Sequence, residues 1–308
     1  MKKLFILLLV VTSCRMGGIA QNVYGDVNGD GVVTAADVTE VYNVILGNMP
    51  TFTYTKYKVN GVAFNMVEVS EGSFLMGATY EQIDGASANE FPVHQVTLSG
   101  FSIGQTEVTQ ELWVAVMGSN PSWFNGTGNP DYDSNHSYFD AGINLRRPVE
   151  SVSWDDCQEF IAKLNEMTGE NFRLPTEAEW EFAARGGNKS RNFIYAGSND
   201  VNNVAWYYYN IPSLPDTEGW GPQTVATKAP NELGIYDMSG NVWEYCQDFY
   251  GDYTADSQVD PTGPASGDFR INRGSSWYDN HVEYCRVAQR RMVPPNEHYA
   301  AYGFRLAR

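Results

Sequence analysis

The chain has 308 residues, with 37 acidic and 20 basic side chains, and its formal net charge is −17. A charge of this sign repels phosphate backbones, so we expect no nucleic acid partner. The apolar fraction is 43% and the aromatic fraction is 14%, which is enough for a packed core and argues against wholesale disorder.

The first twenty residues have the pattern of a signal peptide. Lys2 and Lys3 precede an apolar run over residues 4–11 that is too short to span a bilayer. We therefore predict a signal peptide over residues 1–20 and an exported protein. Cleavage after Ala20 would release a soluble secreted or periplasmic protein. Alternatively, Cys14 lies in a lipobox-like run and would carry a lipid anchor, and the outer-membrane surface is a third possible location. We favour release, because the apolar run before Cys14 is short.

Residues 26–37 have the ligand spacing of a calcium-binding loop. Oxygen-bearing side chains stand at loop positions one, three, five, nine and twelve, and Gly31 allows the sharp turn at position six. The alternative is a metal-free turn rich in Asp, Asn and Gly. The predicted ligands are Asp26, Asn28, Asp30, Val32 through its carbonyl, Thr34 and Asp37.

A short helix is predicted directly after this loop. Val38, Val41, Tyr42 and Ile45 recur at helical spacing, and Gly47 follows as a stop signal. The segment 21–48 therefore resembles a small EF-hand-like loop-helix, one dockerin type I repeat. Dockerins that bind cohesin carry two repeats, and this chain has one, which argues against a cohesin partner. Residues 49–56 are predicted to be a linker.

From residue 57 onward, short strand-like runs such as 66–69 and 96–98 alternate with polar loops. Three helices are predicted. Thr109 caps one that ends at Gly118, Ser153 caps a second, and Thr176 begins a third with a capping-box spacing. In the second helix Cys157 lies on the apolar stripe, so we expect it in the core.

Six sequence blocks follow one another in this part of the chain. They are FLMG at 74–77, QTEVT at 105–109, PVESVSW at 148–154, FRLPTEAEWE at 172–181, GIYDMSGNVWE at 234–244 and GFR at 303–305. The series resembles the formylglycine-generating-enzyme (sulfatase-modifying factor) family along residues 57–308. The resemblance implies an α+β domain with an irregular C-type-lectin-like fold and little regular secondary structure.

Two of these blocks carry specific expectations. We expect Arg173, Glu177 and Glu181 to join a buried polar network that holds loops together. In the family the GIYDMSGNVWE segment wraps a calcium ion, and the resemblance implies a second Ca²⁺ site here. The alternative is that Asp237 hydrogen-bonds its own turn. The implied ligands are the carboxylates of Asp237 and Glu244 and the carbonyls of Gly240 and Val242.

The family's copper-dependent oxidases use two nearby cysteines before the final GFR. The matching stretch, 273–286, holds Cys285 alone, and its distance from Arg290 does not fit either catalytic position. We therefore predict no catalytic residue and no copper, since Cu(I) prefers thiolates. Cys246 and Cys285 form either a disulfide or two free thiols. Two other functions stay open, an oxidase that matures sulfatases and a cell-envelope assembly factor.

The segment 275–302 is dense in Ser, Tyr, Asp, Asn and His, the composition of recognition surfaces. It resembles the variable proteins of diversity-generating retroelements, which display a C-terminal variable patch on the same fold. A fixed ligand site and a solvated loop are the alternatives, and the partner is an unknown protein or glycan. The predicted ligand-binding residues are Trp277, Tyr278, Asp279, Asn280, His281, Glu283, Asn296, His298, Tyr299 and Tyr302.

Overall fold

The computed structural model describes residues 52–126, 144–212 and 219–308. The predicted signal peptide, the lipobox cysteine Cys14, the calcium loop 26–37 and the helix after it lie outside the described residues. Within the described part of the chain, no helix is long and apolar enough to cross a membrane.

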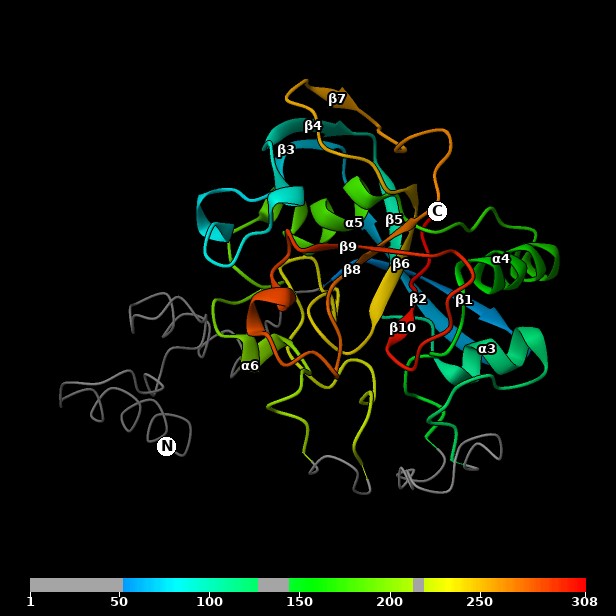
Figure 1. Cartoon of the computed structure of the whole chain (residues 1–308). Coiled ribbons are helices and arrows are strands. Elements are labelled where there is room, and N and C mark those ends of the chain that lie inside the picture. The colour runs from blue at the N-terminus through cyan, green and yellow to red at the C-terminus, as the bar shows by residue number, and fades with distance from the viewer. Residues whose placement is uncertain (1–51, 127–143, 213–218) are drawn as a thin grey trace, which may run out of the picture.

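Three small sheets form the framework (Figure 1). The first, ordered β1-β2-β5, is antiparallel and contains β1 (Tyr54–Val59), β2 (Val62–Val69) and β5 (Phe101–Gly104). The second, ordered β3-β4-β7, contains β3 (Gly72–Met76), β4 (His94–Leu98) and β7 (Gln258–Val259). The third, ordered β10-β6-β8-β9, contains β10 (Tyr302–Gly303), β6 (Trp243–Phe249), β8 (Arg270–Arg273) and β9 (Arg290–Val293).

The predicted helices form with the predicted caps. They are α3 (Gln110–Met117), α4 (Trp154–Thr168) and α5 (Glu177–Ala184). The Thr109, Ser153 and Thr176 side chains accept N–H groups of the first helical turn. The remaining helices are short: α6 (Val201–Val204), η1 (Tyr80–Gln82), η2 (Ala88–Glu90), η3 (Gly187–Lys189) and η4 (Val282–Cys285).

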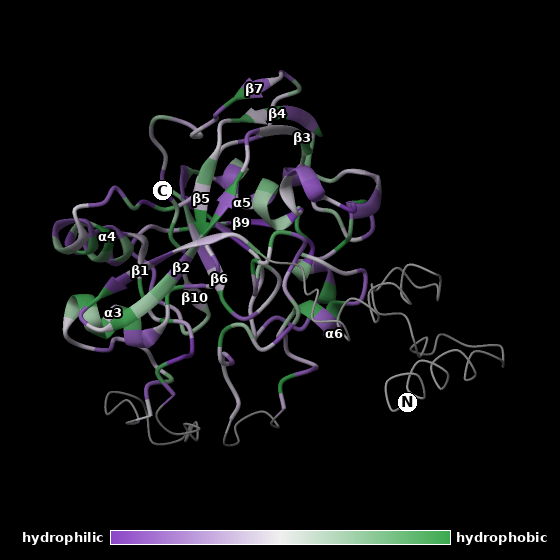
Figure 2. Ribbon diagram, turned by 180° about the vertical axis from the view of Figure 1, so that it is seen from behind, coloured by the Kyte–Doolittle hydropathy of each residue, from purple (hydrophilic) through white to green (hydrophobic). Residues whose placement is uncertain are grey.

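The apolar core lies between the helices and the sheets. Helices α3 and α4 lie together on one side of the molecule, and α6 lies on the opposite side (Figure 1). The α4 ribbon in Figure 2 carries both hydrophobic and hydrophilic segments, as its apolar stripe predicts. Trp113 of α3 stacks on Phe160 of α4 at 5.1 Å, and the Phe304 ring meets both. Cys157 is fully buried in this core, as predicted.

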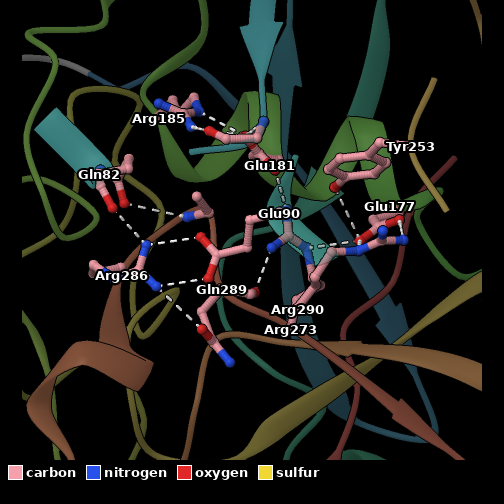
Figure 3. Close-up of polar contacts among 12 residues, drawn as sticks. Gln82, Glu90, Glu177, Glu181, Arg185, Tyr253, Arg273, Arg286, Gln289 and Arg290 are labelled. Atoms are coloured by element: carbon pink, nitrogen blue, oxygen red, sulfur yellow. Dashed lines mark hydrogen bonds and ion pairs between the residues drawn. The ribbon is translucent and has the colours of Figure 1, made fainter. Parts of the chain in front are cut away.

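A buried network of arginines and glutamates joins distant segments (Figure 3). Glu181 pairs with Arg185 and Arg273, and Glu177 pairs with Arg290 at 2.7 Å. On a neighbouring loop the Arg286 guanidinium binds both carboxylate oxygens of Glu90, at 2.7 and 2.8 Å. The prediction of a buried network holds for the two α5 glutamates. Arg173 instead pairs with Glu179 at the edge of the helix.

The predicted fold class is confirmed, because short helices and strands are separated by long loops that many side chains support. One boundary needs correction. Strand β1 begins at Tyr54 and pairs with β2 over six residues, so residues 54–56 belong to the sheet and not to the linker. The Tyr, Thr and Lys side chains at the start of this strand are mostly exposed. Because they show no apolar alternation, the sequence alone did not distinguish this part of the strand from a linker.

Candidate functional site

The segment 234–244 contains a tight loop at residues 237–241, with three residues at positive φ. The φ angles are 58° for Asp237, 81° for Gly240 and 63° for Asn241. The Asn241 N–H donates to the carbonyl of Trp206 at 2.8 Å, and the Gly240 N–H donates to that of Gly274 at 2.7 Å. Left-handed backbone at non-glycine residues costs free energy, and such strain gathers at ligand-binding loops.

The two acids of this loop, Asp237 and Glu244, lie beside a third, Glu107, that was not predicted from the sequence. Glu244 binds Arg305 through both of its oxygens, at 2.5 and 2.6 Å, and accepts the Trp180 indole N–H. Asp237 accepts one backbone N–H on Oδ2, while its buried Oδ1 has no partner among the described residues. Within the same part of the chain, neither oxygen of buried Glu107 has a partner. Burial, reinforced by the charges of Asp237 and Glu244, raises the Glu107 pKa.

These groups fit a divalent cation. Three carboxylates face the single guanidinium of Arg305, so a fully ionised cluster would carry two uncompensated negative charges. The carbonyls of Gly240 and Val242 accept no hydrogen bond from a described residue. Calcium prefers oxygen ligands of these kinds. No group of three or more His, Cys, Asp or Glu side chains converges on a metal position among the described residues, so carbonyls would have to complete the ligand set.

A cavity of about 620 Å³ opens over the third sheet. Its walls come from β6, β9 and β10, from the turn after β8, and from the loops that follow α6 and β9. Six aromatic rings line it together with one cation and two acids. The lining side chains are Tyr208, Tyr209, Trp243, Ser276, Tyr278, Asp279, Asn280, Arg291, Glu297, Tyr299 and Tyr302.

One carboxylate fixes the shape of this cavity. Asp279 Oδ2 accepts the Trp243 indole N–H at 2.8 Å, the hydroxyls of Ser275 and Ser276, and the Ser276 N–H. The Asp279 carbonyl accepts the N–H of Tyr208 at 3.2 Å, which ties the α6 loop to this turn. The cavity is therefore held open by contacts within its own walls, and such preorganisation lowers the cost of binding.

The structure divides the ten predicted ligand-binding residues. Tyr278, Asp279, Asn280, Tyr299 and Tyr302 line the cavity. His281 pairs with Glu283 and His298 pairs with Asp156, each at an exposed position outside the cavity lining. Asn296 is exposed on the β9–β10 loop without lining the cavity.

The assignment of Trp277 to the binding face needs correction. Its side chain is 4% exposed, and its indole N–H donates to the Ala300 carbonyl. Its ring meets Phe124 and Trp220 edge-on, at 5.2 and 5.6 Å. An apolar partner surface from distant segments draws this aromatic residue inward, and the polar local sequence gives no sign of it.

Sequence reasoning missed six lining residues: Tyr208, Tyr209, Trp243, Ser276, Arg291 and Glu297. Three of them, Tyr208, Tyr209 and Trp243, lie outside the stretch 275–302 that composition singled out. One signal was available. The adjacent arginines Arg290 and Arg291 occupy a strand, where successive side chains face opposite sides, so one of them had to face away from the core.

A second cavity, of about 300 Å³, lies beside the N-terminus of α5. Three of its charged groups, Glu177, Asp248 and Arg290, already have partners. Glu177 pairs with Arg290, and Asp248 accepts the Glu177 N–H at 2.9 Å. Burial raises the pKa of Asp248 to about 7. These contacts stabilise the start of the helix, so we assign this cavity a structural role.

The cysteines do not fit a copper centre. Cys157, Cys246 and Cys285 are free, buried thiols in three separate apolar clusters. Burial raises the pKa of each thiol, which opposes thiolate formation. No described cysteine lines either cavity, and the disulfide alternative for Cys246 and Cys285 does not apply.

The fold and its loop-supporting ion pairs define the class of protein, a lectin-like α+β domain of the kind found in formylglycine-generating enzymes. The chain belongs to the sulfatase-modifying factor family, since the model for the "sulfatase-modifying factor enzyme 1-like domain" matches residues 53–308. A dockerin type I domain model matches residues 24–61.

Individual relatives agree with this assignment. The formylglycine-generating enzyme of Streptomyces coelicolor is 32% identical over 78% of this chain and 88% of its own length. The chaperone protein LppX of Paenibacillus barcinonensis is 36% identical over 62% of this chain and 74% of its own length. The solved structure of Treponema denticola variable protein 1 superposes with a TM-score of 0.67 at 34% identity, covering 83% of this chain and 99% of that one.

Proposed function

We propose that residues 57–308 form a non-catalytic domain of an exported protein that binds a partner in the cavity over the third sheet. The observation that carries the proposal is the lining of this cavity. Six aromatic rings line it, three of them from the segment 275–302, and no described cysteine lines it. Rigid aromatic side chains surrounded by adaptable polar groups are typical of recognition surfaces.

The cysteine chemistry supports a non-catalytic function. An oxidase that holds Cu(I) needs adjacent thiolates, because the soft ion prefers sulfur. Each described cysteine is instead buried in a different apolar cluster. Because the chain is related to formylglycine-generating enzymes, an oxidase is the competing function. An oxidase would show turnover of a sulfatase peptide, whereas the non-catalytic proposal predicts none.

An oxidation assay separates the two functions. Purified protein with Cu(I), oxygen and a peptide carrying the sulfatase cysteine motif is expected to yield no formylglycine by mass spectrometry. The Streptomyces coelicolor enzyme, run in parallel, is the positive control. Turnover by this chain that is lost in Cys285→Ser would overturn the non-catalytic proposal.

Calcium is the cofactor of this proposal. The dockerin match implies a calcium loop, and the proposed ligands there are Asp26, Asn28, Asp30, Val32, Thr34 and Asp37. The second proposed site uses Asp237, Gly240, Val242 and Glu244, and the unpartnered oxygens of Glu107 and Asp237 support it. Both sites would act structurally. A cohesin remains a candidate partner of the dockerin segment, although a single repeat argues against it.

An assembly function is the second candidate, and the LppX relative favours it, because that protein is named a chaperone. Binding of a client polypeptide would use the same cavity. The export that we infer for the chain agrees with either function, since a dockerin segment is typical of extracellular proteins.

A further inference from the structure

Arg291 is the one cation in the cavity lining, and within the described residues its donors are unused. Strand β9 turns Arg290 inward, where it pairs with Glu177, and leaves Arg291 exposed on the opposite side. The Arg291 side chain forms no hydrogen bond or ion pair with any described residue. Its guanidinium carbon lies 5.7 Å from the Trp243 ring centroid and 5.6 Å from that of Tyr302.

The two rings hold this cation without consuming its N–H groups. A guanidinium near aromatic faces is attracted by the π electrons, while its planar donors remain available. The Trp243 ring is itself fixed by its hydrogen bond to Asp279. The donors of Arg291 are therefore presented from a rigid platform, and a carboxylate matches their geometry with two parallel hydrogen bonds.

The other charged side chains of the cavity limit the kind of ligand that can carry this carboxylate. Asp279 and Glu297 also line the cavity, so the charged side chains of the lining sum to −1, on a protein whose formal charge is −17. A polyanion such as an acidic polysaccharide would be repelled. A ligand with one carboxylate next to neutral or aromatic groups satisfies Arg291 and stacks on the tyrosines.

We propose that this cavity binds a peptide segment that presents a single carboxylate, from its C-terminus or from one acidic side chain, to Arg291. The proposal rests on the binding function proposed above and names its ligand class. The tyrosine-rich lining suits peptide groups and aromatic side chains, and a volume of about 620 Å³ is in the range of ligand-binding cavities.

The test uses the full mature chain in calcium-containing buffer and an array of synthetic hexapeptides. Each peptide carries one Asp, Glu or free C-terminal carboxylate beside Tyr, Phe or Gly, and each has a twin in which that group is an amide. The wild type is expected to bind a subset of the acids at least about tenfold more tightly than their twins, because hydrogen bonds to a charged group are strong.

Two variants at surface arginines form the matched pair. Arg291→Gln should lose about 10- to 100-fold in affinity for the bound acids and keep its affinity for the amide twins. Arg146→Gln removes the same charge at an exposed position outside the cavity lining and should bind like the wild type. Arg291→Lys keeps the charge without the two-pronged geometry and should fall between them.

Tyr278→Ala separates failure of this proposal from failure of the binding function. Peptide binding that Tyr278→Ala weakens, but that shows no preference for acid over amide, would overturn the carboxylate proposal and leave the cavity as a binding site. A parallel panel of neutral and uronic acid oligosaccharides supplies the other outcome. Binding there alone, again sensitive to Tyr278→Ala, would overturn the peptide ligand. Absence of binding in both panels would overturn both proposals.

Discussion

Glu150 shows how a single residue links the fold to pH. Its carboxylate is fully buried and accepts the Phe124 N–H and the Ser151 hydroxyl, each at 2.8 Å. Burial raises its pKa from 4.5 to about 7, and these hydrogen bonds offset only part of the shift. Between those two values the folded state binds more protons than the unfolded state, so this residue makes the free energy of unfolding fall as pH rises.

Replacement of Glu150 by Gln should remove that dependence. The shift of about 2.5 pKa units corresponds to about 3 kcal/mol between pH 4.5 and 7. The stability of Glu150→Gln relative to the wild type should therefore rise by up to about 3 kcal/mol across this window, measured by urea unfolding at several pH values. If the free energy of unfolding depended on pH in the same way for both proteins, the raised pKa assigned to Glu150 would be wrong.

At the scale of elements, the loop 234–244 depends on Gly240. A Cβ built there would lie 2.3 Å from the carbonyl oxygen of Trp206, and its φ is +81°. Gly118, which ends α3, has a φ of +83° with no atom within 4 Å of a built Cβ. The two glycines thus have nearly the same positive φ and differ in the space around them.

Substitution of each glycine by alanine separates the two costs. Gly118→Ala should lower the free energy of unfolding by about 1 kcal/mol, the cost of the left-handed backbone. Gly240→Ala should cost at least about 2 kcal/mol more, because the loop must move away from Trp206. Chemical denaturation measures both, and equal losses would show that the close approach to Trp206 has no energetic consequence.

This loop and the loop 26–37 together give the calcium prediction. Titration of chelator-stripped protein should reveal two sites, of which Asp30→Ala removes one and Asp237→Ala removes the other. A ligand that binds only the folded state raises its stability, by about 2.7 kcal/mol at a hundredfold excess over Kd. Calorimetry that detects no heat, together with an unchanged Tm, would refute both sites.

For the whole molecule, sequence patterns predicted what is local. The caps at Thr109, Ser153 and Thr176 could be predicted because a cap and its helix are adjacent in the chain. The order of the six blocks predicted the fold, as the family match over residues 53–308 confirms. The composition of segment 275–302 predicted five of the eleven residues that line the cavity.

The remaining lining residues, apart from Arg291, could not be predicted from the sequence. Tyr208 reaches the cavity because a loop bonds to the carbonyl of Asp279, and Arg291 reaches it through strand alternation. Trp277 looked like a surface residue, because its burial depends on Phe124 and Trp220, which are far away in sequence. The unpartnered carboxylate of Glu107 belongs to another block altogether. These features arise only when distant segments meet.

The opposite orientations of Arg290 and Arg291 bear on how such a protein can evolve. The ion pair of Arg290 with Glu177 anchors the strand from inside, whereas exposed Tyr209 and Tyr278 contribute little to the apolar core. Surface substitutions away from such anchors usually change stability by less than about 0.5 kcal/mol. The exposed residues that line the cavity can therefore be substituted while the fold stays stable. Over evolution such a protein can exchange one ligand for another without passing through unstable variants.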